Sequence, residues 1–257
     1  MKIFSFLSLL CFVALFACGN PTPTDAEVQK ASPRPYVDWK TAAEKPDIKI
    51  QVEGAPPGGW AYLIGIFQDQ QYKVDSAQVD ATGLAHFTNT EPYHPGFMFV
   101  MFPNGITLQS LVDLDQTFSM RTKAADLNGA MVVEGNTDTE LLYQSVKFED
   151  SQRAAFQANA MKIGSVPKGT PEYQQAKADQ DKLLDARAAY LNDLFKKYPD
   201  SFFTSFKRGG QNPDLRKVID NTQAFDTARY AYRYRRDFWK GVDLGDERLL
   251  YTPVIAN

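Results

Sequence analysis

Alternating hydrophobic and polar residues mark the chain between Asp47 and Gly135 and predict a series of short β-strands. The predicted strands cover residues 48–52, 61–67, 72–78, 86–88, 97–102, 106–112, 117–122 and 131–133. Pro103-Asn104-Gly105 separates two apolar runs and predicts a hairpin turn. Short strands at this spacing predict an antiparallel, β-sandwich-like domain over residues 47–135.

At Asn136 the pattern changes to the three- and four-residue spacing of amphipathic helices. A first helix is predicted from Asn136 or Thr137 to about Ile163, and a second from Thr170-Pro171 to Tyr198. Shorter helices are predicted over residues 201–207, from Asn212-Pro213 to Asp220, and over 222–240. The sequence therefore predicts an α+β fold, with the β-sandwich-like domain followed by a C-terminal α-helical bundle over residues 136–257.

The N-terminus has the pattern of a secretory leader. Lys2 precedes an uncharged apolar run from Ile3 to Phe16, which is shorter than the roughly 20 residues that a membrane-spanning helix needs. The run ends in Leu15-Phe16-Ala17-Cys18, which resembles the lipobox of bacterial lipoproteins. This resemblance implies cleavage after residues 1–17, lipid on the sulfur of Cys18 and acylation of the new N-terminus, a firm membrane anchor. Ordinary secretion, or an uncleaved leader that stays in the membrane, are the alternatives.

Residues 18–46 contain five prolines without a sustained period and predict a tether between the anchor and the folded domain. Tyr36, Val37 and Trp39 are candidates to pack the end of this tether against the domain.

Composition narrows the range of functions. The formal charge is −3, or −4 once the leader with its single charged residue, Lys2, is removed. This weakly acidic balance argues against general nucleic-acid binding. The sequence holds two cysteines, Cys11 in the leader and Cys18. The predicted mature chain therefore lacks a Cys-x-x-Cys motif and is not expected to perform thiol chemistry.

The last predicted helix carries a basic stripe that is a candidate surface for a partner. Arg229, Arg233, Arg236 and Lys240 follow one another at steps of four, three and four residues, and Trp239 lies beside them. An anionic partner, such as a glycan, a phosphate or an acidic protein face, would fit this stripe. The alternative is a solvated basic face over an aromatic core, with an inner apolar stripe formed by Phe225, Ala228, Tyr232 and Trp239.

Catalytic and metal-binding patterns are missing from the sequence. His86 and His94 are its two imidazoles, and neither has a recognisable partner or nucleophile motif. Asp243, Asp246 and Glu247 match no calcium loop, so each is expected to cap a turn or to meet an arginine. We expect no metal, no cofactor and no enzymatic activity on this chain.

Two segments resemble a known family. The segment from Ile48 to Glu140, through Val74-Asp75-Ser76-Ala77 and Gly83 to Phe87, resembles the β-rich domain of unknown function in many envelope thioredoxin-like lipoproteins. The segment from Phe238 to Pro253 resembles the end of the helical region that follows that domain. In that family a thioredoxin fold with a redox Cys-x-x-Cys normally comes next, and its cysteines match no position before Asn257.

The resemblance implies a scaffold, docking or dimerisation role in envelope redox maintenance, with a thioredoxin-like protein or a second copy of the chain as partner. We therefore expect a lipid-anchored, non-catalytic envelope protein, at the outer membrane facing the periplasm because Gly19 follows Cys18 instead of an aspartate. The alternative is a glycan- or peptide-binding lipoprotein that uses exposed aromatic residues, with Trp60, Tyr62, Tyr93 and Trp239 as candidates.

Overall fold

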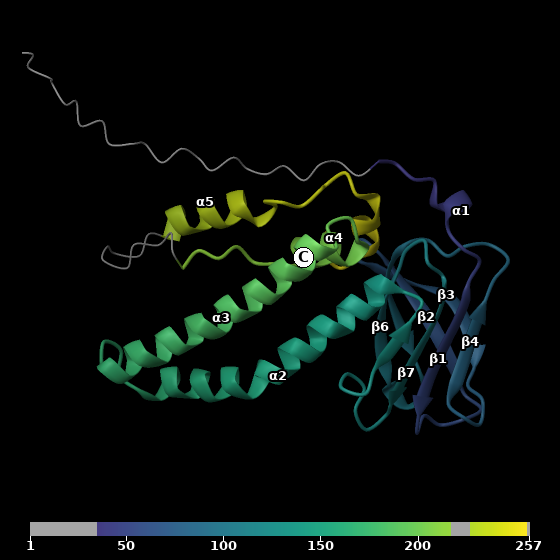
Figure 1. Cartoon of the computed structure of the whole chain (residues 1–257), viewed down its shortest axis with the longest axis horizontal. Helices are drawn as coiled ribbons and strands as arrows, with labels where there is room; N and C mark the ends of the chain where they lie inside the picture. Colours follow the sequence, from purple (N-terminus) through teal and green to yellow (C-terminus); the bar gives the residue numbers. More distant parts are fainter. Residues whose placement is uncertain (1–34, 217–226, 256–257) are drawn as a thin grey trace, which may run out of the picture.

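The computed structural model describes residues 35–216 and 227–255. Two four-stranded sheets lie at one end of the molecule, and two long helices project away from them (Figure 1). The α+β fold predicted from the sequence is confirmed. The strands are β1 (Asp47–Glu53), β2 (Trp60–Phe67), β3 (Gln70–Gln78), β4 (Leu84–Thr88), β5 (Gly96–Met101), β6 (Thr107–Val112), β7 (Thr117–Lys123) and β8 (Val132–Glu134).

The sheets have the strand orders β4-β1-β7-β8 and β3-β2-β5-β6. Neighbouring strands are antiparallel except β1 and β7, which run parallel with Asp47 opposite Thr117. This parallel pair is the one departure from the antiparallel arrangement predicted from the sequence. It joins strands about seventy residues apart, and strand-by-strand patterns carry no information on such a pairing.

The alternating pattern places one side of each sheet in a shared core. On β1, Ile48, Ile50 and Val52 are at most 1% exposed, whereas the residues between them reach the surface. Along β2, Ala61 and Leu63 face this core, and Ile66 lies on the opposite side, in a second core beneath the helices. The predicted hairpin turn is confirmed between β5 and β6, because Asn104 and Gly105 both adopt positive φ angles of 61° and 76°.

The second core joins the helices to the sheet that contains β2. Helices α2 (Thr137–Ser165), α3 (Pro171–Lys197) and α4 (Phe202–Gly209) meet there, with Phe202 and Phe203 fully buried. Asn136 caps α2 by accepting a hydrogen bond from the Thr139 amide at 2.7 Å. Its side-chain amide also donates to the carbonyl oxygens of Leu111 and Asp115, which fixes the start of α2 to the end of β6.

The remaining elements are α1 (Trp39–Ala42), α5 (Thr227–Phe238) and the 3-10 helices η1 (Pro103–Gly105) and η2 (Glu247–Tyr251). The helix predicted from Asn212 to Asp220 is wrong for residues 212–215, which are not helical, and its last residues lie outside the described ranges. The Asn212 side-chain oxygen instead accepts a hydrogen bond from the Tyr234 hydroxyl at 2.7 Å. The beginning of the predicted helix over 222–240 also lies outside these ranges. Within them, no helix is both long and apolar enough to cross a bilayer.

Candidate functional site

A buried arginine fastens the end of the chain to the β-sandwich. Arg248, in η2, donates to Asp246 at 2.6 and 2.8 Å and to Asp113 at 2.6 Å. Asp113 directly follows β6, and its side chain is 12% exposed, against 8% for Arg248 and 4% for Asp246. The guanidinium also lies over the ring of Phe202, 4.8 Å from its centroid. One residue therefore links the C-terminal segment, the β-sandwich and α4.

Local hydrogen bonds hold Arg248 in position for these contacts. Asp246 caps η2 by accepting from the Arg248 amide at 3.2 Å, so the same aspartate fixes the backbone and neutralises the side chain. Burial acts to raise the pKa of Asp246, but its bonds with Arg248 outweigh burial and lower it below the usual range. Asp246 is therefore ionised at neutral pH and forms a charged pair with the arginine.

A third carboxylate, that of the half-buried Asp138, lies near this ion pair at the start of α2. Burial raises the pKa of Asp138 to about 6, although the Phe203 amide donates to it at 2.8 Å. The neighbouring carboxylate of Asp113 adds to the rise and Arg248 opposes it. Asp138 therefore titrates close to neutral pH, at the junction of α2 and α4.

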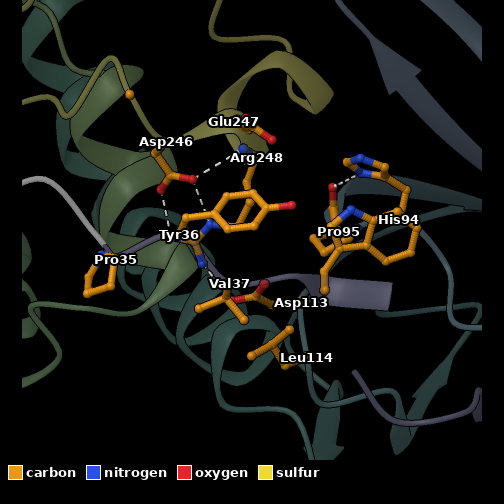
Figure 2. A pocket seen from close by; sticks show the side chains of 12 residues that line it. Pro35, Tyr36, Val37, His94, Pro95, Asp113, Leu114, Asp246, Glu247 and Arg248 are labelled. Carbon is orange, nitrogen blue, oxygen red and sulfur yellow. Dashed lines mark hydrogen bonds and ion pairs between the residues drawn. The ribbon is translucent and has the colours of Figure 1, made fainter. Parts of the chain in front are cut away.

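A cavity of about 120 Å³ lies between the N-terminal segment and the Arg248 pair. It is lined by Pro35, Tyr36, Val37, Trp39, His94, Pro95, Asp113, Leu114, Gly245, Asp246, Glu247 and Arg248. Figure 2 shows the Tyr36 ring lying across the cavity, between Arg248 and Pro95. Since Tyr36 is 79% exposed, this wall is open to solvent. The space is smaller than the several hundred Å³ of a typical ligand pocket. We refer to this contact region, where residues 35–39 meet residues 245–248, as the seam.

An aromatic row runs beside this seam and brings together four separate parts of the chain. The ring of His94 stacks on Tyr251 with centroids 3.5 Å apart and meets Trp39 at 4.6 Å. Tyr251 in turn contacts Phe67 at 5.0 Å. Trp39 thus packs against the domain as expected for the end of the tether. Farther along that segment, the Glu44 side chain accepts from the amides of Gln116 and Thr117.

The two histidines occupy different surroundings. Burial lowers the pKa of His94, whose Nδ1 lies 2.8 Å from the carbonyl oxygen of Pro95. His86 pairs with Asp47 at 2.7 Å on the outer side of β4 and β1, so the expectation that it lacks a partner is wrong. The pair could be predicted only once β1 and β4 were known to be neighbouring strands, because Asp47 then lies close to His86. Both side chains are more than 40% exposed, and the pair forms part of a surface row of charges.

Two of the three acidic residues near the C-terminus, Asp243 and Asp246, make the contacts expected from the sequence. Asp246 caps a turn and meets Arg248, and Asp243 accepts from the Gly245 amide at 3.0 Å. Across residues 35–216 and 227–255, no group of three or more histidine, cysteine or acidic side chains is placed to hold a metal ion.

The predicted basic stripe lies on and just after α5. Arg229, Arg236 and Lys240 are exposed, and Arg233 and Trp239 are half-buried. Arg236 pairs with Asp237 at 2.8 Å. The predicted inner apolar stripe is wrong at Tyr232, which is 66% exposed, and at Ala228, which is also exposed; Phe225 lies outside the described residues.

The inner side of α5 is formed by other aromatic residues. Tyr230, Tyr234 and Phe238 contact one another along the helix at 6.3 and 5.6 Å. Aromatic residues therefore lie on two sides of α5, and no local pattern distinguishes the inner set from the exposed Tyr232.

The exposed aromatic residues expected for a binding surface are present on the sheet that contains β2. Trp60 and Tyr62 are 48% and 40% exposed, and Met101, paired with Tyr62 across the strands, is 42% exposed. Tyr93 does not belong to this surface, because it is 4% exposed and its hydroxyl donates to Asp75. Its packing and hydrogen bond explain why an aromatic residue in a loop is buried.

Cys18 lies outside the described residues. Sequence reasoning did not single out Arg248, because its partner Asp113 lies 135 positions away and no local pattern connects the two.

In comparisons with known proteins, no family model, curated protein or solved structure gives a significant match to the chain.

Proposed function

We propose that the protein is a lipid-anchored, non-catalytic scaffold or docking module of the bacterial cell envelope. The observation that carries this proposal is Leu15-Phe16-Ala17-Cys18 at the end of an apolar leader, in a sequence whose other cysteine lies within that leader. Each CH₂ group of an acyl chain on Cys18 that enters the bilayer would add about 0.8 kcal/mol to the binding free energy. More than one such chain is enough for stable attachment.

The contacts of the N-terminal segment support a role that depends on position. Trp39 packs on His94, and Glu44 accepts two backbone hydrogen bonds at the start of β7. A tether ending in this segment would be continuous with the folded domain, so it would hold the domain at a limited distance from the membrane. A scaffold or docking module needs such placement more than it needs a reactive group.

The proposed location is the outer membrane, facing the periplasm, because Gly19 follows Cys18. The proposed partner is a thioredoxin-like protein or a second copy of this chain, as the resemblance to envelope thioredoxin-like lipoproteins implies. No cofactor forms part of this proposal.

Lipidation is tested by mass spectrometry of the protein purified from membranes of the native host. We expect an N-terminal peptide that begins at residue 18 and carries the mass of acyl chains. C18A should abolish both the added mass and the membrane fraction, whereas C11A should change neither, since Cys11 leaves with the leader. A native protein with an intact leader or an unmodified Cys18 would refute the anchoring.

The absence of thiol chemistry is tested by insulin reduction with the lipid-free chain. A thioredoxin assayed in parallel provides the positive control. Turnover above the uncatalysed rate by the purified chain would refute the non-catalytic part of the proposal.

A second candidate function, glycan or peptide binding, is favoured by the exposed group formed by Trp60, Tyr62 and Met101. Aromatic side chains on a flat sheet face can stack on sugar rings or cover extended peptides. W60A/Y62A should then abolish retention on immobilised peptidoglycan fragments or peptides, whereas Y232A, at an exposed aromatic residue on α5, should not. Retention that survives W60A/Y62A would exclude this surface.

A further inference from the structure

Helix α5 combines a strong positive charge with very little packing. It contains four arginines and one aspartate, a formal charge of +3, in a chain whose total is −3, so the other residues together carry −6. None of its twelve residues is buried. A helix of this length is marginal in water unless one face packs against something.

Three aromatic residues mark one side of α5. Tyr230, Tyr234 and Phe238 contact one another along that side, and the Tyr234 hydroxyl donates to Asn212, so Tyr234 faces the protein. At about 100° per residue, Tyr232 and Arg236 lie on the opposite side. Arginines flank this side on both edges: Arg229, Arg233 and Arg235. Trp239, just beyond the helix, is half-buried and its ring contacts Phe238 at 4.7 Å, so it lies at the edge of this surface.

This outward side has the chemistry of a membrane interface. Tyrosine and tryptophan rings prefer the level of the lipid headgroups, and arginine side chains reach from there to phosphate groups. Basic residues near an anionic bilayer each add to the binding. By contrast, a helix that docks into a protein groove relies on aliphatic anchors at helical spacing, and the aliphatic residues of α5 are Ala228 and Ala231.

The position of α5 agrees with this chemistry. In Figure 1, α5 and the first described residues of the N-terminal segment both lie along the upper margin of the molecule. In this view, the segment that would continue into the proposed tether thus lies at the same margin as α5.

We propose that the outward side of α5, with Tyr232, Arg235 and Arg236 at its centre, binds the surface of an anionic phospholipid bilayer. The helix lies in the plane of the headgroups, with its arginines on lipid phosphates. This contact does not depend on lipid at Cys18: it would orient the domain on the membrane, whereas the anchor would only retain it.

The test measures binding of the chain from residue 18, carrying C18S, to phosphatidylcholine vesicles with and without phosphatidylglycerol. All described elements are retained in this chain. We expect sedimentation with the anionic vesicles that weakens as salt is added. In a W39F/W60F background, the emission of Trp239 should shift to shorter wavelength on binding.

Three sets of variants make the test specific. R229Q/R235Q/R236Q should lower the partition coefficient about twenty-fivefold or more, since each basic residue contributes roughly a fivefold factor and Arg236 already pairs with Asp237. K182Q/K196Q/K197Q removes the same charge from exposed positions on α3 and should bind like the parent. R229K/R235K/R236K should also bind, and Y232A should reduce binding without removing its salt dependence.

Equal binding to both kinds of vesicle, or equal losses for the α5 and α3 variants, would overturn the proposal. Binding to polyglutamate but not to anionic vesicles would also overturn it, in favour of an acidic protein partner. Because the chain used cannot be lipidated at residue 18, failure here leaves the proposed lipid anchor unaffected, and failure of the anchor leaves this result unaffected.

Discussion

Replacing Arg248 with alanine should destabilise the protein by about 3–5 kcal/mol, because it removes the cation from a buried ion pair. Asp113 and Asp246, 12% and 4% exposed at their side chains, would lose the guanidinium that neutralises them. The contact of the guanidinium with Phe202 at 4.8 Å would also be lost.

Arg216 provides a matched control at the protein surface. It meets Asp181, Asp185 and Asp214 at 2.6–3.2 Å, one carboxylate more than Arg248. Its side chain is 26% exposed, and those of its partners are 46–56% exposed, so water screens the charges. R216A should therefore cost about 1 kcal/mol or less.

The assay is equilibrium urea unfolding of the chain from residue 18 at neutral pH, with the change in unfolding free energy taken at constant m-value. If R248A costs less than about 1 kcal/mol, or no more than R216A, the reasoning that burial decides the strength of this pair is wrong.

Three further predictions use the same unfolding measurement. Because the pKa of Asp138 is raised to about 6, the folded state holds a proton that the unfolded state releases. The stability contributed by this group therefore falls by up to about 3 kcal/mol as pH rises from about 4 to above 6. D138N should remove this pH dependence, and an unchanged slope would contradict the assignment. G83A should cost more than about 2 kcal/mol, because a Cβ at a φ of 79° would collide with a backbone oxygen of β1. G105A, with a similar φ but open space around it, should cost about 1 kcal/mol, and equal costs would show that strain alone matters. N136A should cost about 2–3 kcal/mol, since it removes a buried cap and leaves two carbonyl oxygens without this donor. T170A, at the half-buried cap of α3, should cost about 1 kcal/mol, and a reversed order would contradict the role of Asn136.

Much of the fold could be predicted because each element carries its own local signal. The alternation around Ile50, the hairpin residues Asn104-Gly105 and the capping residues Asn136 and Thr170 each act within a few positions of the chain. Those signals place the strands, one turn and the starts of the long helices close to where the structure has them.

Features that depend on distant partners could not be predicted in this way. The parallel pairing of β1 with β7, the contact of His86 with Asp47 and the burial of Tyr93 each depend on which strands become neighbours. The ion pair between Arg248 and Asp113 joins residues 135 positions apart, so no spacing rule finds it. Asn212 is a further example, because its side-chain oxygen, which we expected to cap a helix, accepts a hydrogen bond from the hydroxyl of Tyr234, 22 residues away.

The position of β1 within its sheet bears on how the domain withstands tension. The strand has β4 on one side and β7 on the other, and its first residue, Asp47, follows directly from the segment that begins at Pro35. A pull on that segment acts along the strand, so the backbone hydrogen bonds on both sides share the load and must break together. A hairpin strand peeled from one end would lose them one at a time. A chain pulled from its N-terminal side would therefore load β1 along its length, with paired strands on both of its edges.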